Sequence, residues 1–170
     1  MKKILLLLTI ILSGCGSGMS VLKERGFTNE QINAIPKGAT QLIVEKKVSK
    51  DALFDEMVRV LIDRGYRIEK ESKDQGYITT EGKCCLQLST SYRANIVFSE
   101  NNGVSRAVIK SEWTANTGIA MYGVVAMPDW YETKWDGGQR TSIAFAESIA
   151  IANAIENAEN GGRHFHRRAD

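Results

Sequence analysis

The chain offers few side chains of the kind that perform acid–base or nucleophilic chemistry. Residues 15–160 contain no histidine, so the body of the protein has no histidine to act as a general base. The GxSxG, HExxH and Walker A motifs are also missing from the sequence. The carboxylates of Asp129, Glu132 and Asp136 could do acid–base work, but basic residues stand beside them, as is typical of solvated surface charges. We therefore predict a non-enzymatic protein that needs no cofactor.

Two further groups of residues could carry chemistry. Cys84 and Cys85 are adjacent, and the pair is interpreted either as thiols at different depths or as a strained disulfide, with a redox or metal role as the alternative. His164 and His166 follow a Gly-Gly pair near the end of the chain, where solvated tails are common. The basic tail 161–170 could instead bind a metal or contact anionic lipid headgroups. We predict a solvated tail and no metal site.

The N-terminus carries the most specific pattern in the sequence. Lys2 and Lys3 precede an apolar run over residues 4–12, which is too short to span a membrane but suits an export signal. The motif Leu12-Ser13-Gly14-Cys15 then resembles the lipobox of bacterial lipoproteins. An ordinary secretory signal with a chance cysteine is the alternative.

The lipobox resemblance implies how the protein is processed and where it resides. Residues 1–14 would be the signal peptide, and Cys15 would become the acylated first residue, since several acyl chains give a stable anchor. The resemblance implies a lipid-anchored (palmitate-bearing) protein of the bacterial cell envelope. Gly16 rather than aspartate follows the cysteine, which favours the periplasmic face of the outer membrane in a Gram-negative host.

The composition limits the remaining possibilities. The 170 residues are 25% charged and 43% hydrophobic, as expected for one globular domain. There are 22 basic and 20 acidic residues, so removal of Lys2 and Lys3 leaves a net charge of zero. A neutral chain carries no nucleic-acid signature.

Aromatic residues gather in one segment of the chain. Five of the thirteen aromatic residues fall within residues 113–135, among glycines typical of a loop or broken hairpin. Loops rich in tryptophan and tyrosine suit contacts with proteins or ligands. The alternative is that the segment folds over the sheet and closes the core. The candidate binding residues are Trp113, Tyr122, Trp130, Tyr131 and Trp135.

Periodicity and capping signals predict the elements. Apolar positions over residues 49–64 repeat with helical spacing, with Ser49 as the N-cap and Gly65 just beyond the end. The motif Asn101-Asn102-Gly103 predicts a tight hairpin turn. The other expected elements are a short helix after Thr28, strands over 41–48, 77–80, 86–99 and 104–114, a strand that starts at 66–68 and precedes a turn at 73–76, and a helix over 141–157.

The order of these elements predicts an α+β fold. We expect a two-layer sandwich, with a mainly antiparallel sheet and two helices on one face, in the order β-α-β-β-β-β-α. Residues 15–38 are expected as a lipidated tether whose short helix packs on the domain or stands off the membrane, and residues 39–160 as a single domain. The order over residues 40–157 resembles the helix-grip-like domains of small envelope lipoproteins of the BamC type.

These observations lead to two main hypotheses of function. The first is a membrane-anchored lipoprotein whose domain binds an envelope protein or supports an assembly. The second is a carrier that holds a small amphiphile between sheet and helix. An enzyme that uses carboxylates is the third. The partners expected are the membrane, through the lipid on Cys15, and an envelope protein, and not nucleic acid.

Overall fold

The computed structural model of the chain describes residues 18–86, 90–115, 129–136, 140–156 and 161–166. The lipobox with Cys15, and Tyr122 of the aromatic segment, lie outside these residues. None of the helices in the described part is long and apolar enough to cross a membrane.

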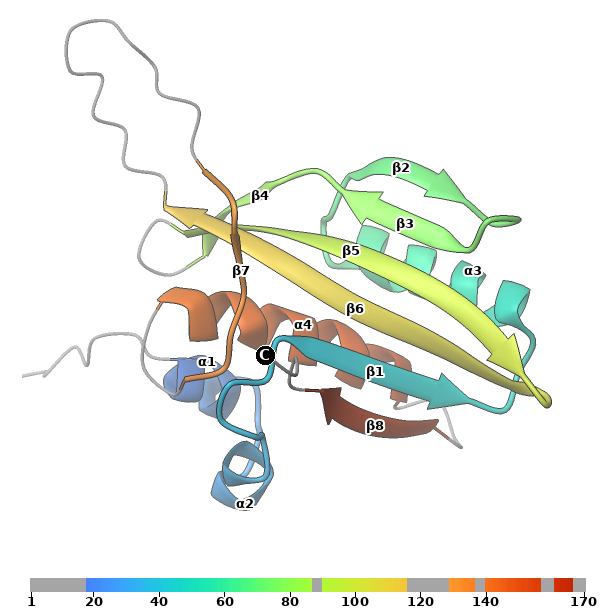
Figure 1. The fold of residues 1–170 in the computed structure, drawn as a ribbon. Helices are drawn as coiled ribbons and strands as arrows, with labels where there is room; N and C mark the ends of the chain where they lie inside the picture. Colours follow the sequence, from blue (N-terminus) through green and yellow to red (C-terminus); the bar gives the residue numbers. More distant parts are fainter. Residues whose placement is uncertain (1–17, 87–89, 116–128, 137–139, 157–160, 167–170) are drawn as a thin grey trace, which may run out of the picture.

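One antiparallel sheet forms the centre of the molecule. The described residues contribute eight strands in the order β2-β3-β5-β6-β1-β8, with β4 paired to β5 and β7 paired to β6. Figure 1 shows the long β5–β6 hairpin crossing the middle of the sheet. The strands are β1 (Gln41–Lys46), β2 (Ile68–Ser72), β3 (Tyr77–Thr80), β4 (Lys83–Leu86), β5 (Thr90–Asn101), β6 (Val104–Ala115), β7 (Tyr131–Glu132) and β8 (Gly161–His166).

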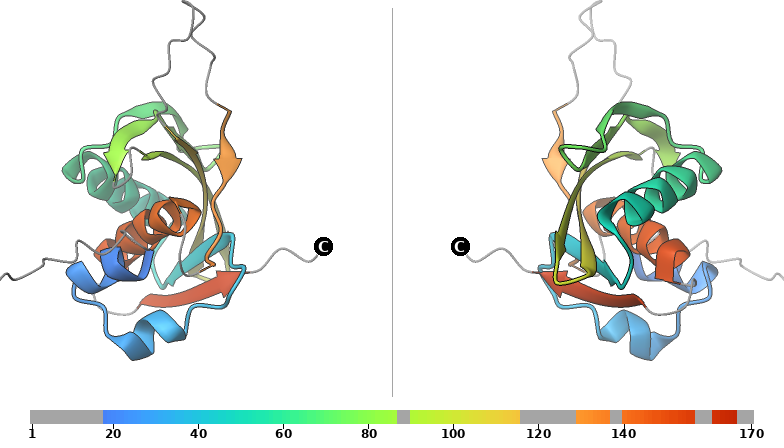
Figure 2. Two further views of the ribbon diagram at one scale, coloured as in Figure 1. Left: turned by 90° about the vertical axis from the view of Figure 1, so that its left-hand side faces the viewer. Right: turned by 90° about the vertical axis from the view of Figure 1, so that its right-hand side faces the viewer.

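Helices cover one face of this sheet. The helices are α1 (Gly18–Glu24), α2 (Asn29–Asn33), α3 (Lys50–Asp63) and α4 (Arg140–Glu156). Figure 2 shows α3 and α4 on the same side of the curved sheet, while the other side carries no helix. The predicted α+β sandwich with an antiparallel sheet is therefore confirmed.

The clearest predicted helix has the caps that its sequence indicated. The Ser49 hydroxyl accepts a hydrogen bond from the backbone N–H of Ala52 at 3.2 Å, and Asp51 lies in the first turn. Gly65 follows the last turn with a φ of 75°, a conformation that favours glycine. The apolar side of α3 fills the core with Leu53, Phe54, Met57 and Leu61.

The segment expected as a tether packs on the domain. Leu22 of α1 is completely buried and Val21 is 5% exposed. A Cβ atom added at Gly18 would lie 2.6 Å from the Cβ of Ser142, so α1 meets the start of α4 without room for a side chain. Thr28 and Gln31 form the predicted capping box of α2. Ile32 of α2 is 3% exposed and belongs to the core, so of the two alternatives for this short helix the structure shows the packed one.

The tail expected to be solvated contains a strand. Residues 161–166 form β8, which pairs antiparallel with β1, so that His164 lies opposite Ile43 in register. Without β8, β1 would present unpaired backbone N–H and C=O groups at the sheet edge. This pairing requires the segment to be extended, which the Gly-Gly pair and the basic composition did not indicate. Residues 161–166 are therefore a paired strand and not a free tail, and residues 167–170 of the expected tail lie outside the described residues.

The turn at Gly76 lies close to the backbone of β5, and a substitution at this glycine tests that contact. Gly76 has a φ of 70°, and an added Cβ would lie 2.9 Å from the carbonyl oxygen of Phe98. Gly103 has a similar φ of 74° but open space around it. We expect Gly76→Ala to lower the free energy of unfolding by about 2 kcal/mol, and Gly103→Ala by about 1 kcal/mol. Urea unfolding followed by circular dichroism measures both, and equal losses would contradict the close approach at Gly76.

Candidate functional site

An aromatic cluster forms where β7 pairs with the end of β6. Tyr131 lies opposite Trp113 in this pairing, and the centroids of their rings are 5.7 Å apart. The guanidinium of Arg93, on the neighbouring strand β5, lies 4.4 Å from the centre of the Trp130 ring. Trp113 lies opposite the buried Tyr92 in register, so Trp113 and Tyr131 are on the helix-covered face, whereas Arg93 and Trp130 are on the helix-free face. The structure therefore places three of the predicted binding residues at one end of the sheet, and we call Arg93, Trp113, Trp130 and Tyr131 the aromatic cluster.

The local contacts hold this cluster in place. A Cβ atom at Gly82 would lie 2.8 Å from the ring of Trp130, so the indole lies directly on that glycine. The Arg93 Nε donates a hydrogen bond to a carboxylate oxygen of Glu112 at 2.6 Å, which fixes the guanidinium over the indole. Tyr131 is 54% exposed. Preorganised aromatic and arginine side chains are common at protein–protein contacts.

Trp135 does not belong to this surface. Its side chain is 5% exposed, and its ring centroid lies 6.3 Å from that of Phe145 in α4. Its backbone N–H donates to the carbonyl of Ala39, and its carbonyl accepts from Gly38. The prediction of Trp135 as a binding residue is therefore wrong, because this tryptophan closes the core. Trp113 contacts Tyr131 and also packs against the buried residues of the core.

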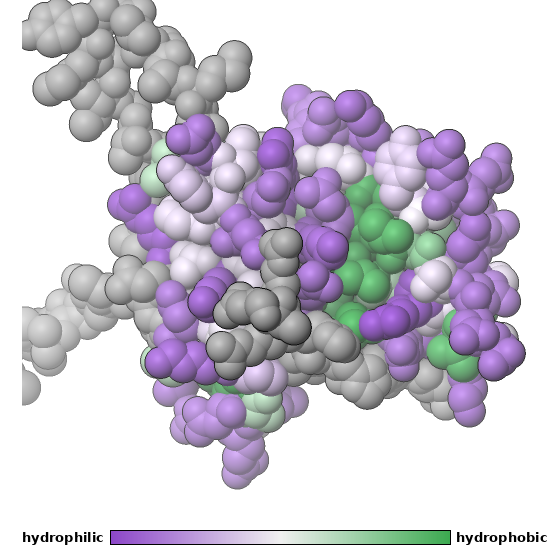
Figure 3. Space-filling model, viewed as in Figure 1, coloured by the Kyte–Doolittle hydropathy of each residue, from purple (hydrophilic) through white to green (hydrophobic). Residues whose placement is uncertain are grey.

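An apolar row crosses the helix-free face of the sheet, with Asn95 and Lys110 between it and the Arg93–Trp130 pair. In register, Tyr77 lies opposite Val97, Val97 opposite Val108, and Val108 opposite Ile43. Val97 is 52% exposed and Val108 half-buried, whereas Ile43 is only 2% exposed. Figure 3 looks onto this face and shows a hydrophobic patch between hydrophilic side chains. The row was missed from the sequence because its members belong to four strands and meet only through the register.

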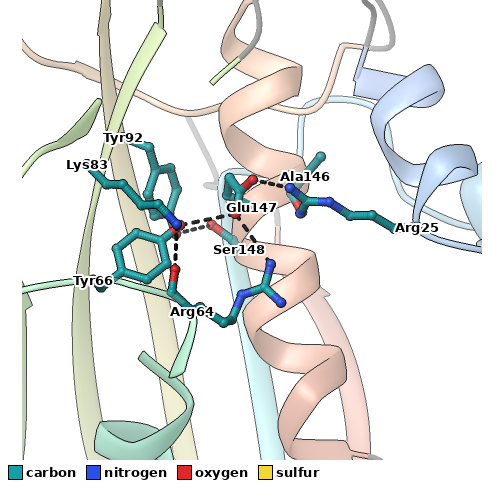
Figure 4. Close-up of polar contacts among 8 residues, drawn as sticks. All are labelled: Arg25, Arg64, Tyr66, Lys83, Tyr92, Ala146, Glu147 and Ser148. Carbon is teal, nitrogen blue, oxygen red and sulfur yellow. Dashed lines mark hydrogen bonds and ion pairs between the residues drawn. The ribbon is translucent and has the colours of Figure 1, made fainter. Parts of the chain in front are cut away.

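A buried carboxylate forms the main polar network behind the sheet (Figure 4). Glu147, in the middle of α4, is 3% exposed and forms ion pairs with Arg25 and Arg64. The hydroxyl of Tyr66 donates to its second oxygen at 3.1 Å. Burial alone would raise the pKa of Glu147, but the hydrogen bond from Arg25 and the charges of both arginines outweigh it, so the net pKa is lowered. Glu147 is therefore held as an anion.

A chain of hydroxyl groups continues beside this anion. The hydroxyl of Tyr92 lies 2.9 Å from that of Ser148, which lies 2.8 Å from Ser111, and Ser111 lies 2.6 Å from Thr133. Burial raises the pKa of Tyr92, so this phenol stays protonated. Each hydroxyl has a partner within the chain. The arrangement fixes α4 to β5, β6 and the segment after β7, and we assign it a structural role.

The predicted carboxylates do not converge. Glu132 and Asp129 are exposed, while an oxygen of Asp136 accepts a hydrogen bond from the Ser142 hydroxyl at the start of α4. Among the described residues no group of histidine, cysteine, aspartate or glutamate side chains could hold a metal ion. Cys84 is disulfide-bonded, and the chain's other cysteines are Cys15 and Cys85.

Two cavities of about 190 Å³ open at the surface of the described residues. The first is polar and lies beside Lys83, whose ammonium group is 4.5 Å from the centre of the Tyr66 ring. The second lies between α1, α2 and the segment before α4, and we call it the α1–α2 pocket. Its apolar lining is Met19, Ile32, Ile35 and Trp135, and its polar rim is Asn33, Lys37 and Asp136.

Comparison with known proteins adds little to this geometry. No family model matches the chain, and no curated protein matches it. Among solved structures, a DUF4468 family protein from Bacteroides ovatus ATCC 8483 is similar, with 14% sequence identity and a TM-score of 0.36. The match covers 72% of this chain and 91% of that chain. A likeness at this TM-score carries no argument about function.

Proposed function

We propose that this protein is a membrane-anchored envelope lipoprotein whose domain binds another protein without performing catalysis. The lipobox-like motif ending at Cys15 supports the anchor. The single observation that supports protein binding is that the stacked Arg93–Trp130 pair and the apolar row lie on the same helix-free face, where Val97 is 52% exposed. Together they form a surface with fixed aromatic groups and exposed apolar side chains, which suits a protein partner.

The same structure favours this function over an amphiphile carrier. A carrier would need a cavity between the sheet and the helices. There, Leu42, Ile96, Ile109, Phe145 and Ile149 are at most 1% exposed, so side chains fill the space between the layers. The groups that could do acid–base chemistry behind the sheet are paired with one another in the Glu147 network.

Site-specific crosslinking tests the proposed binding surface. A photoreactive benzoylphenylalanine replaces Lys110 or Val97, which are both exposed on the helix-free face, in the full-length protein, expressed in a bacterial host and irradiated in intact membranes. A matched control places it at Ile62, an apolar residue of α3 that is 58% exposed and lies away from this face. We expect the same discrete crosslinked partner at Lys110 and Val97 and none at Ile62.

A second variant links the crosslink to the aromatic cluster. Trp130→Ala removes the ring on which Arg93 stacks but leaves Lys110 and Val97 in place. We expect it to reduce the crosslink from Val97 severalfold while the circular dichroism spectrum stays native. Crosslinks of equal yield from all three positions, or a yield that Trp130→Ala leaves unchanged, would contradict the proposed surface.

A further inference from the structure

The distance between the anchor and the folded domain is set by three residues. The described residues begin with α1 at Gly18, and Cys15 is three positions earlier in the sequence. Even fully extended, three residues span about 11 Å. A lipid on Cys15 therefore keeps Gly18 within about 11 Å of the membrane surface, which is less than the width of a second small domain.

The position of α1 in the fold is equally fixed. Gly18 packs directly on Ser142 at the start of α4, and Leu22 is completely buried. Arg25, just after α1, is bound to Glu147 in the middle of α4. Because α1 cannot swing away from the domain without breaking these contacts, the lipid would hold the domain by this end. Figure 1 places α1 and α2 at the end of the molecule away from the turn between β5 and β6.

The surface at this end has an apolar opening, the α1–α2 pocket, among the exposed polar side chains of α2. The α1–α2 pocket opens beside Met19, which is the second residue of α1 and is 41% exposed. Its walls are the apolar side chains of Ile32, Ile35 and Trp135, and Lys37 stands at the rim. Apolar groups gain free energy by contact with lipid hydrocarbon, and a lysine at the rim can meet a lipid phosphate.

We propose that the end of the domain formed by α1, α2 and the α1–α2 pocket lies on the bilayer that holds Cys15, with lipid hydrocarbon in the pocket. This inference rests on the proposed lipid anchor, and it adds an orientation. The pocket faces the membrane, and the turn at Asn102 points away from it. The occupant of the pocket is the bilayer, because the lipid on Cys15 and the three residues up to Gly18 hold the bilayer close to α1.

Quenching of Trp135 by lipids tests this orientation. Trp113→Phe combined with Trp130→Phe leaves Trp135 as the only tryptophan of the mature chain. The lipidated protein is reconstituted into vesicles of phosphatidylethanolamine and phosphatidylglycerol, with or without bromine on the acyl chains. We expect Trp135 to lose most of its fluorescence with brominated chains. A soluble Cys15→Ser form of the same variant should show no loss with the same vesicles.

A second measurement needs no replacement of tryptophan. Hydrogen exchange of the wild-type lipidated protein in vesicles is compared with that of Cys15→Ser in solution. We expect slower exchange in α2 of the anchored form and equal exchange at the turn around Asn102. A Met19→Asn variant should show less protection of α2 than Met19→Leu.

The outcomes separate this inference from the function on which it rests. If mass analysis shows the lipid on Cys15, but bromine does not quench Trp135 and α2 is not protected, the orientation is wrong and the anchor stands. If Cys15 carries no lipid, both proposals fail. Quenching of the lipidated form alone, with protection confined to α1 and α2, supports the orientation.

Discussion

Replacing Glu147 with glutamine is expected to destabilise the fold at neutral pH by about 2–4 kcal/mol, because it leaves two arginines without their buried anion. Arg25 and Arg64 converge on this carboxylate from the end of α1 and the end of α3, and Tyr66 donates to it from the start of the next segment. The network therefore joins three parts of the chain to α4. Urea unfolding followed by circular dichroism measures the loss.

A matched control separates burial from charge. Asp55→Asn removes the carboxylate of an ion pair with Lys73, in which the side chains are 58% and 41% exposed. We expect no measurable change in unfolding free energy for this variant, since exposed ion pairs add little to stability. Similar losses for Glu147→Gln and Asp55→Asn would contradict the structural role assigned to the buried network.

The pH dependence gives a second check on Glu147. The pKa of this carboxyl in the folded protein lies below 4.5, the ordinary value for a glutamic acid side chain, so its contribution to stability is fully present above that pH. The contribution is lost as the pH falls through the folded pKa. In this range the carboxyl is already protonated in the unfolded state but still ionised in the folded state, so proton binding favours unfolding. We expect the difference in stability between wild type and Glu147→Gln to narrow in this acid range and to be constant above it.

Replacing Cys15 with serine is expected to have the largest effect on location. Serine has no thiol to accept the diacylglycerol, so the variant should lose palmitate labelling and leave the membrane fraction of a bacterial host. Ser17→Ala is the matched control, since it changes a neighbouring small residue and leaves the lipobox motif unchanged. Labelling that persists in Cys15→Ser, or that is lost equally in Ser17→Ala, would contradict the assignment of Cys15.

Local signals in the sequence predicted much of the fold. Ser49 and Gly65 bound α3 because capping depends on residues within a few positions of the helix end. Asn102 and Gly103 adopt the positive φ that their hairpin turn requires, with values of 51° and 74°. These features depend on neighbours in the chain, and so the sequence alone was enough.

Features that depend on distant partners were not predicted. β8 exists because the edge of β1 is available for pairing, and nothing within residues 161–166 indicates that partner. Trp135 and Tyr131 are both aromatic and lie four residues apart in the same segment. Only the fold shows that the Trp135 ring is buried and the Tyr131 ring is exposed. The apolar row likewise depends on the register of four strands.

Glu147 could have been found by its position. Glu147 lies four residues after Ile143 and four before Ile151, so an acidic side chain is flanked by two apolar side chains on the same face of the helix. Both isoleucines are at most 1% exposed, and the glutamate between them is buried with them. A charged residue at the centre of a core-facing stripe predicts a buried partner of opposite charge. Its partners, Arg25 and Arg64, come from elsewhere in the sequence and only the structure identifies them.

The most direct test of the account is the mass of the N-terminal peptide of the mature protein purified from bacterial membranes. The account predicts a chain that begins at Cys15, with diacylglycerol on its sulfur and a further acyl group on its amine. A chain that begins at Met1, or one cleaved at another position without attached lipid, would contradict the anchor and the membrane-facing orientation of α1 and α2.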